Sequence, residues 1–412
     1  MICNLPKRLF LGFLFISLLN LMACASGKTQ LPETTDIPIV NTPESVNQNL
    51  VLATNTPEAV SNQTEVIAPN NLEVVYGKSG NLWILIKGAL FQLTDSGRDS
   101  DPRISKDNQL ISFTRGGELW VMDLAGGNQR KVFGHTGQGL FQFEFISNTH
   151  KIIFSTTGSD GQPRLDLNVV DADQGQVQGL LAVGEGGEFT PSPDWKTLAL
   201  VQQGKLISYS LESQKPIVVY QFQPLKGQNM DHFVPISWLE DGNGFNTVIP
   251  AANGKPALFL FIPISGGNTG QLAELSPVSP LESETLLSPD GSKILYLKSQ
   301  AENLEMHVVD ASTADRTYLR KPTGEMGLIG WEPDSTNMLF WVNDPRYVYF
   351  TDGVKVTRLS ETITASVDNI LWLDMEHCLV ISDSNLLFVV PGQLAKMIDH
   401  GAAKLFDGLF LR

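Results

Sequence analysis

Short apolar runs separated by polar turns fill this chain from Leu72 to its end. Runs such as LISFTR, LWVMDL, KIIFSTT and TLALVQQ are six or seven residues long and rich in aliphatic and aromatic residues. Gly, Asp, Asn and Ser stand between the runs, as is typical of turns that connect strands. No apolar pattern clearly keeps a helical period over three turns, so we predict an all-β fold.

A polar turn recurs through this β-rich region. The turns read SKD, SNT, SPD, LED, SPD, EPD and WLD, and their third residues stand at positions 107, 149, 194, 241, 290, 334 and 374. Successive turns are 40 to 49 residues apart, which is the period of a four-stranded propeller blade. Each repeat is predicted to hold a strand entering the turn, two strongly apolar strands and a weaker amphipathic fourth strand.

The seven turns predict seven complete blades. The segment 72–94 adds three strands without a leading turn, which are the second, third and fourth strands of a further blade. Its missing first strand can come from the tail LFDGLFLR (405–412), which would close the ring and remove an open sheet edge. The count favours a β-propeller of eight four-stranded blades, closed by the C-terminal strand. Seven blades are the alternative, if the N-terminal strands or the irregular fourth repeat lie outside the ring.

The repeats resemble those of the TolB-type, WD40-like (PD40) β-propeller family. The stretches ISFTRGGELWVMDLAGGNQRK, LSPDGSKILYL and TPSPDWKTLALV follow its pattern of Ser-Pro-Asp-Gly, a buried strand, a strand with Trp or Tyr before Met-Asp, and paired glycines before a basic residue. The turns SNT, LED and WLD depart from this pattern. The resemblance implies a TolB-like propeller domain over residues 72–412.

The N-terminus has the composition of a secretion signal. Lys7 and Arg8 precede the apolar stretch Leu9–Leu21, which is shorter than the ~20 residues that cross a bilayer. The following LMAC resembles a bacterial lipobox, in which a Leu and a small residue mark a Cys for lipid attachment. We therefore predict a lipoprotein signal peptide over residues 1–23 and lipidation of Cys24. An ordinary signal peptide with a chance Cys, or an uncleaved anchor, is the alternative.

Residues 24–71 differ in character from the rest of the chain. They are rich in Pro, Thr and Asn and contain no aromatic residue. Too little apolar area is available in such a segment to offset the entropy lost on folding. We predict a disordered linker between the lipid anchor and the propeller.

Charge and cysteine content narrow the class of partner. The net charge of −15 argues against nucleic acid, because phosphate binding needs clustered Lys and Arg. The acidity indicates a soluble surface, or alternatively a cationic ligand. Removal of Cys3 with the signal and lipidation of Cys24 leave Cys378, in the apolar run HCLVIS, without a disulfide partner. We expect its thiol to be buried in a strand.

The turn carboxylates are the first candidate site. They are Asp107, Asp194, Asp241, Asp290, Asp334 and Asp374. A catalytic residue is needed once, whereas these recur in almost every repeat, so we interpret them as structural acceptors of backbone N–H groups in tight turns. In the first repeat, the side chains of Ser105, Asp107 and Arg115 are of the types found in active sites. The repeat explains the first two residues but not Arg115.

Other motifs predict no catalytic residue, cofactor or metal site. The chain lacks a Gly-x-Ser-x-Gly elbow, and its six histidines have no metal-ligand spacing. His232 lies in the loop NMDHF and is interpreted as solvated. The acidic segments DADQG (171–175) and TDSGRDSD (94–101) lack the ligand ladder of a calcium loop and are interpreted as β-turns.

Four tryptophans give a hint of ligand binding. Trp195, Trp238, Trp331 and Trp372 lie at or beside the predicted first strands, which in a propeller are nearest the central axis. They would line a funnel for sugars or a peptide if they were exposed. Packing between neighbouring blades also places aromatic residues at equivalent positions, and we favour that interpretation.

These observations favour a lipid-anchored propeller of the cell envelope. Because a rigid propeller presents loops on two faces, we favour a non-enzymatic protein-binding or scaffolding module whose partner is an unknown envelope protein or peptide. A glycan-binding or small-ligand-binding protein that uses the central funnel is the first alternative. A propeller hydrolase or lyase with carboxylates at the axis is the second.

Overall fold

The structure is a computed structural model of the whole chain. It describes residues 72–134, 137–202, 204–223, 234–249, 256–275, 285–300, 303–310, 316–321, 326–342 and 347–410. The predicted signal peptide, Cys24 and the predicted linker lie outside the described residues, as does His232. Within the described ranges, no helix has the length and apolar character needed to cross a membrane.

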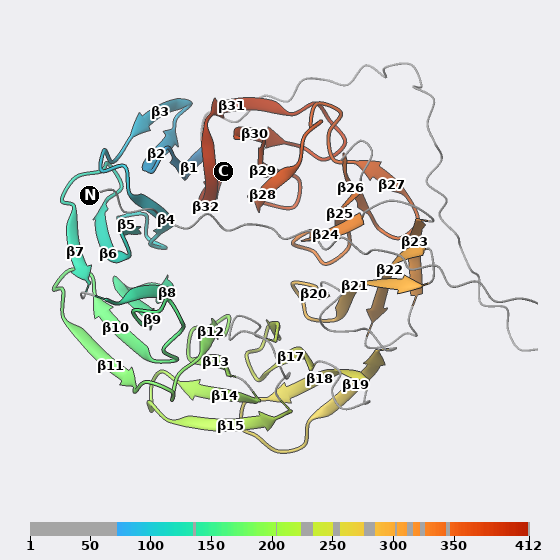
Figure 1. Cartoon of the computed structure of the whole chain (residues 1–412), viewed down its shortest axis with the longest axis horizontal. Coiled ribbons are helices and arrows are strands. Elements are labelled where there is room, and N and C mark those ends of the chain that lie inside the picture. The colour runs from blue at the N-terminus through green and yellow to red at the C-terminus, as the bar shows by residue number, and fades with distance from the viewer. Residues whose placement is uncertain are drawn as a thin grey trace, which may run out of the picture. The chain divides into compact units, whose positions relative to one another are not determined.

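Eight antiparallel sheets of four strands form a ring, as predicted (Figure 1). Blade 1 holds β32 (Ala402–Phe410), β1 (Leu72–Lys78), β2 (Asn81–Ile86) and β3 (Ala89–Gln92); blade 2 holds β4 (Asp99–Ile104), β5 (Leu110–Arg115), β6 (Glu118–Asp123) and β7 (Arg130–Phe133); blade 3 holds β8 (Gly139–Phe145), β9 (Lys151–Thr157), β10 (Leu167–Asp171) and β11 (Val177–Leu181); blade 4 holds β12 (Glu188–Pro191), β13 (Thr197–Gln202), β14 (Lys205–Ser210) and β15 (Pro216–Gln221).

The other four blades follow in the same order from the axis outwards. Blade 5 holds β16 (Ile236–Trp238), β17 (Gly244–Ile249), β18 (Ala257–Pro263) and β19 (Gly270–Leu275); blade 6 holds β20 (Thr285–Leu287), β21 (Lys293–Gln300), β22 (Asn303–Asp310) and β23 (Arg316–Lys321); blade 7 holds β24 (Met326–Trp331), β25 (Met338–Val342), β26 (Tyr347–Thr351) and β27 (Val356–Arg358); blade 8 holds β28 (Val367–Trp372), β29 (Cys378–Ser382), β30 (Asn385–Val389) and β31 (Lys396–His400).

The C-terminal strand closes the ring. Strand β32 pairs antiparallel with β1, so that Leu72 faces Phe410 and Tyr76 faces Leu405. It takes the innermost place in blade 1, where the other blades use their first strand. This confirms eight blades and closure by the tail. The strand starts at Ala402, before the predicted start at residue 405, because the pairing continues past a bulge to Lys78.

Side chains at this junction hold blade 8 to blade 1. Asp399 of β31 accepts hydrogen bonds from the Tyr76 hydroxyl at 2.5 Å and from the Lys78 ammonium at 2.8 Å. The same ammonium lies 4.8 Å from the centre of the Trp83 ring. Burial alone would raise the pKa of Asp399, but the bonds from Lys78 and Tyr76 hold it below its ordinary value. The carboxylate is therefore charged at neutral pH and bridges the two blades.

The core lies between the blades, which explains why the middle strands are apolar without alternation. In β13, Leu198 and Leu200 pack towards blade 3, whereas Ala199 and Val201 pack towards blade 5. All six residues of β13 are buried. Both faces of such a strand are removed from water, as in other sheets that are covered on both sides.

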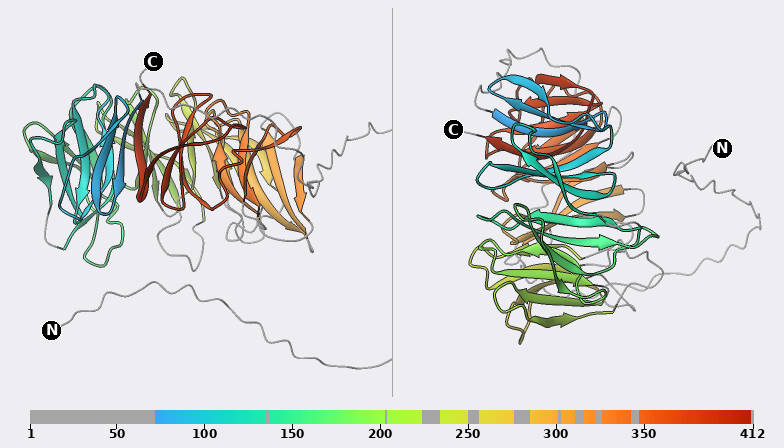
Figure 2. Two further views of the ribbon diagram at one scale, coloured as in Figure 1. Left: turned by 90° about the horizontal axis from the view of Figure 1, so that it is seen from above. Right: turned by 90° about the vertical axis from the view of Figure 1, so that its left-hand side faces the viewer.

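The outermost strands are partly exposed, as predicted. In β15, Pro216, Ile217 and Val218 are exposed while Val219 is buried. Figure 1 shows β11, β15 and β19 at the rim of the ring, and Figure 2 shows the ring from the side. Cys378 is the first residue of β29, all of whose residues are buried, and it is a free cysteine, as predicted. Burial raises the pKa of its thiol. A buried thiol of this kind is unreactive.

Candidate functional site

The six turn carboxylates share one hydrogen-bond pattern. Each accepts the backbone N–H two residues further along, in the pairs Asp107–Gln109 (3.2 Å), Asp194–Lys196 (3.1 Å), Asp241–Asn243 (3.0 Å), Asp290–Ser292 (3.0 Å), Asp334–Thr336 (2.8 Å) and Asp374–Glu376 (2.8 Å). Where a serine stands two positions earlier, as Ser288 does before Asp290, its hydroxyl donates to the carboxylate at 2.6 Å. These carboxylates are thus bonded to their own turns.

The protonation state of these carboxylates agrees with a role as acceptors. Burial alone would raise the pKa of Asp290, but hydrogen bonds from Ser288 and Ser292 outweigh it and lower the pKa. Bonds from the Lys196 side chain, the Lys196 backbone and Ser192 lower the pKa of Asp194 to about 2. Both groups are ionised at neutral pH, so neither has a proton to donate as a general acid.

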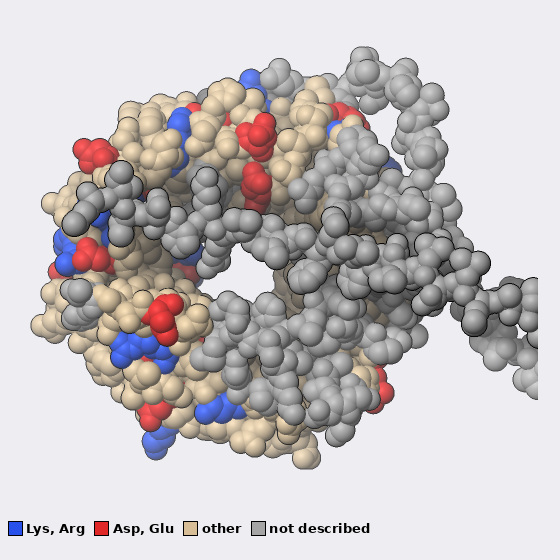
Figure 3. All heavy atoms as spheres, viewed as in Figure 1, with Lys and Arg blue, Asp and Glu red and all other residues tan. Residues whose placement is uncertain are grey.

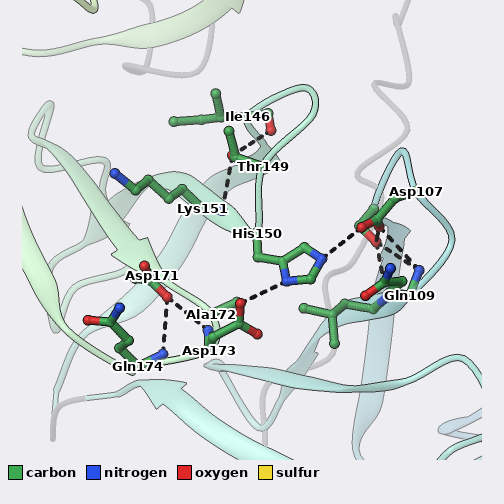
Figure 4. Close-up of polar contacts among 12 residues, drawn as sticks. Asp107, Gln109, Ile146, Thr149, His150, Lys151, Asp171, Ala172, Asp173 and Gln174 are labelled. Carbon is green, nitrogen blue, oxygen red and sulfur yellow. Dashed lines mark hydrogen bonds and ion pairs between the residues drawn. The ribbon is translucent and has the colours of Figure 1, made fainter.

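Asp107 also takes part in a contact between blades 2 and 3 (Figure 4). The His150 ring lies between two carboxylates, with Nε2 2.9 Å from Asp107 Oδ2 and Nδ1 2.8 Å from Asp173 Oδ2. Arg130 of blade 2 also lies 3.6 Å from Asp173. Burial would lower the pKa of His150, but the bonds to Asp173 and Asp107 outweigh it and raise the pKa. His150 therefore joins the two blades most strongly when it is protonated.

We expect the contribution of His150 to stability to depend on pH. Because its folded-state pKa is raised, this contribution is complete below the unfolded pKa of about 6.5 and is lost as the pH rises through the folded value. His150→Gln should lower the free energy of unfolding by about 1 kcal/mol or less at pH 5.5, and by a smaller amount at pH 8.5. Urea unfolding at the two pH values measures this difference.

The matched control is His400→Gln. This variant removes a ring that bonds the uncharged amide of Asn385 at 2.8 Å, and it is measured beside His150→Gln at both pH values. An effect of His150→Gln that did not change between pH 5.5 and 8.5 would contradict a charged bridge.

Arg115 forms an ion pair within blade 2 and not with the Ser105–Asp107 turn. Its Nε donates to Asp99 Oδ1 at 2.7 Å, one Nη donates to Asp99 Oδ2 at 3.1 Å, and the guanidinium lies 4.6 Å from the centre of the Trp120 ring. The residues that looked like a working site in the sequence therefore serve two separate structural contacts.

Two of the tryptophans tie neighbouring blades together. Trp238 of blade 5 donates its indole N–H to the Thr190 carbonyl of blade 4 at 3.0 Å. Trp331 of blade 7 donates in the same way to the Leu286 carbonyl of blade 6 at 3.3 Å. Their exposed fractions are only 8% and 7%. These contacts agree with packing between blades, and Trp195 and Trp372 are likewise packed beside inter-blade clusters.

Two cavities lie along the inner strands of blades 5 to 8. The β16–β24 cavity has a volume of about 410 Å³ and is lined by Pro193, Ile236, Ser237, Trp238, Leu286, Leu287, Ser288, Pro289, Gly330 and Trp331. The β24–β28 cavity has a volume of about 290 Å³ and is lined by Ile329, Gly330, Trp331, Leu339, Val367, Asp368, Asn369, Ile370 and Trp372. Gly330 and Trp331 line both, so the two cavities adjoin. Figure 3 shows an opening at the centre of the ring, and Figure 1 shows the first strands of the blades on the side that faces the centre.

Two β-bulges shape the β24–β28 cavity. In β24 the pairing passes from Leu328 to Gly330 and leaves Ile329 as the extra residue. In β28 it passes from Val367 to Asn369 and leaves Asp368 as the extra residue. A bulge redirects the side chains of its strand, and bulges are frequent beside functional sites. Here both extra residues line the cavity.

Gly330 keeps the wall between the cavities open. No heavy atom lies within 4 Å of the place where a Cβ would stand at this position. A side chain at position 330 would therefore enter open space and not the packed core. In the stretch LIGWE this glycine stands directly before Trp331. Three of the four tryptophans that the sequence placed beside the axis, Trp238, Trp331 and Trp372, line the cavities as well, so they were the sequence signal for this region.

The serine hydroxyls that line the β16–β24 cavity are bonded within the protein. Ser237 donates to the Ser288 and Pro289 carbonyls at 3.1 Å, and Ser288 donates to Asp290, so both hydroxyls are engaged. The lining residues include no His, Cys, Lys or Arg within the ranges that the structure describes. The same ranges contain no group of three or more His, Cys, Asp or Glu placed to hold a metal ion. The β16–β24 cavity has mainly apolar walls, whereas the β24–β28 cavity combines apolar residues with Asn369 and one carboxylate, Asp368.

Comparison with known proteins supports the fold and does not assign a family. No protein-family model matches the chain, and a search of curated proteins found no match. A crystal structure of a eukaryotic initiation factor is 12% identical, covers 82% of this chain and 98% of its own, and has a TM-score of 0.53. An oligogalacturonate lyase in complex with manganese has a TM-score of 0.49 at 13% identity, covering 78% of this chain and 96% of its own. A putative TolB from Agrobacterium tumefaciens has a TM-score of 0.35 at 16% identity, covering 55% of this chain and 86% of its own. The first similarity is one of fold alone, and the other two are too weak to add to it.

Proposed function

We propose that this protein is a non-enzymatic protein-binding module, held at the cell envelope by lipid on Cys24. In this proposal the β16–β24 and β24–β28 cavities take up apolar side chains of an envelope protein or peptide. The observation that carries the proposal is the pair of adjoining cavities that share Gly330 and Trp331, the larger of them mainly apolar, on inner strands beside the central opening. Pockets of this kind, largely apolar with few polar groups, are the usual form of a binding site.

The two alternatives receive less support from the same residues. A glycan site needs exposed indole faces, whereas Trp238 and Trp331 are buried and their N–H groups bond backbone carbonyls. Trp372, which is half-buried, is the one partly exposed indole in the described lining. A hydrolase or lyase needs convergent groups of matched pKa, whereas the described lining of the two cavities offers one carboxylate, Asp368. We therefore place binding before catalysis.

Site-specific cross-linking in the producing cells tests the proposed function. A photo-reactive phenylalanine at position 330 would project into the cavities, and the same residue at position 179 provides the control. Gly179 lies on the outer strand β11, where an added Cβ would have only an ordinary contact, 3.7 Å from Asn168 Oδ1. We expect a discrete cross-linked polypeptide from position 330 and none from position 179. A folded variant that yields no polypeptide adduct at 330, or one that yields a polysaccharide adduct, would contradict the proposal.

The lipid anchor has its own test. Cys24→Ser should abolish incorporation of a labelled fatty acid and release the protein from the membrane fraction, because the thiol is the predicted site of acylation and an acyl chain gains ~0.8 kcal/mol per buried CH₂. Cys3→Ser, within the predicted signal, should leave labelling intact. Labelled Cys24→Ser protein would show that the LMAC motif is not a lipidation site.

We also propose that the turn carboxylates have a structural role only. Asp290→Ala removes an acceptor of the Ser288 hydroxyl and the Ser292 backbone N–H, so it should lower the free energy of unfolding by about 1 kcal/mol. Chemical denaturation measures this loss, and cross-linking from position 330 in the same background should persist. Loss of the cross-link at unchanged stability would give the turn a functional role.

A further inference from the structure

Asp368 is the feature of the β24–β28 cavity that apolar packing does not explain. It is exposed, and it is the extra residue of the β28 bulge. Four of the residues around it are Ile329, Trp331, Ile370 and Trp372, which form apolar walls. A carboxylate that a bulge places at this cavity indicates that the cavity discriminates between ligands by charge as well as by shape.

Among the residues that the structure describes, none lining the cavity balances the charge of Asp368. Within the described ranges its side chain makes no hydrogen bond or ion pair, and no basic residue lines either cavity. The chain as a whole carries a net charge of −15. A cationic group is attracted to such a place and an anionic group is repelled from it.

We infer that the β24–β28 cavity binds an apolar group that carries a positive charge, offered by a Lys or Arg beside an apolar residue of the partner. This inference rests on the proposed function and names the chemistry of the partner. The methylene stem of such a side chain lies along apolar walls while its head group stays near the surface, where it meets the Asp368 carboxylate. A volume of about 290 Å³ is at the lower limit of ligand pockets, so the cavity suits one side chain or a small amine.

Small probes of one shape and different charge test the inference. Hexylammonium, 1-hexanol and hexanoate are titrated into the folded protein and followed by ligand-observed NMR. We expect hexylammonium to bind roughly two- to fivefold more tightly than 1-hexanol, the size of effect that one partly exposed charge gives, and hexanoate to bind more weakly than either. Asp368→Asn should remove the preference, and Asp368→Lys should transfer it to hexanoate.

Filling the cavity provides the matched control. Gly330→Leu should abolish binding of all three probes, because its side chain enters the open space between the two cavities. Gly179→Leu, on the outer strand β11, should bind them as the wild type does. Thermal unfolding of each variant verifies that the fold is retained.

A displayed library of random nonapeptides distinguishes a peptide from a free amine as the source of the charge. Selection on the wild-type protein, with Gly330→Leu protein as the counter-selection, should enrich Lys or Arg next to Leu, Ile or Phe. Equal binding of hexylammonium and 1-hexanol, or a preference that persists in Asp368→Asn, would overturn the cationic site while the cross-link at position 330 still supports the proposed function. Hexylammonium binding that depends on Asp368, with no peptide enriched and no cross-link, would retain the cationic site and overturn the peptide partner.

Discussion

A chain that ends at Gly401 is expected not to form a closed ring. This deletion removes β32, which pairs with β1 from Leu72 to Lys78. Leu72, Val74 and Tyr76 are completely buried, and their strand would become an open edge at the centre of the molecule. Each buried backbone group left without a partner costs about 1–3 kcal/mol. Several such losses, together with the apolar surface exposed, approach the whole stability of a typical protein, about 5–15 kcal/mol.

Complementation makes the deletion informative whether or not the shortened chain is compact. A peptide with the sequence of residues 402–412, AAKLFDGLFLR, should restore the near-UV circular dichroism and the urea midpoint when it is added to the shortened protein. A peptide of the same composition in scrambled order is the control. A shortened protein with the wild-type midpoint would show that β32 does not hold the ring closed.

The architecture could be predicted because the same turn-and-strand pattern occurs seven times in the sequence. A polar turn every 40 to 49 residues, followed by two apolar strands, has few physical solutions other than stacked blades. Closure was also predictable, because segment 72–94 lacked a first strand that only the tail had the pattern to supply. The residues Ala402 to Lys404 were missed because they are small or polar and join β1 through backbone pairing around a bulge.

The cavities were not predictable to the same extent. The β24–β28 cavity depends on Ile329 and Asp368, each an extra residue in an inner strand. An extra residue moves every side chain after it to the opposite face of the strand. Apolar periodicity in a run of six residues does not reveal such a shift. Gly330 was visible in the sequence, but a glycine in a strand indicates a bulge, a bend or a close approach equally well.

Arg115 illustrates the same difference between local pattern and tertiary contact. Its partner Asp99 lies at the start of the inner strand β4, while Arg115 ends β5, so the antiparallel pairing brings the two residues opposite each other. Among the described residues of the other blades no ion pair joins these two positions, and therefore the repeat left Arg115 unexplained. The pairing of Asp99 with Arg115 follows from the register of one blade.

Replacing Arg115 with methionine is expected to lower the free energy of unfolding by about 3–5 kcal/mol, because a buried carboxylate loses its counter-charge. Asp99 is only 3% exposed, and both of its oxygens accept from the guanidinium. Methionine retains much of the contact with the Phe113 and Trp120 rings, over which the guanidinium lies. The double variant Asp99→Asn/Arg115→Met should recover more than half of the loss in urea unfolding. A double variant as unstable as the single one would assign the loss to packing over the rings.

The pH dependence separates these two causes independently. In the wild type burial would raise the pKa of Asp99, but bonds from Arg115, Thr94 and Ser96 outweigh it and lower the pKa. The stability that Asp99 contributes is therefore complete above its unfolded pKa of about 3.9, and is lost as the pH falls through the folded value.

In Arg115→Met no guanidinium offsets the effect of burial, so the pKa of Asp99 should rise above its ordinary value. As the pH falls, Asp99 of the variant should therefore be protonated before Asp99 of the wild type, and this removes the unpaired buried charge. The difference in unfolding free energy between wild type and Arg115→Met should thus narrow from pH 7 to pH 4. The double variant has no carboxyl at position 99, so only the wild type has an Asp99 that titrates. The difference in unfolding free energy between the wild type and the double variant should therefore change less over the same pH range. A difference for Arg115→Met that stayed constant over this range would show that an unpaired buried charge is not what destabilises it.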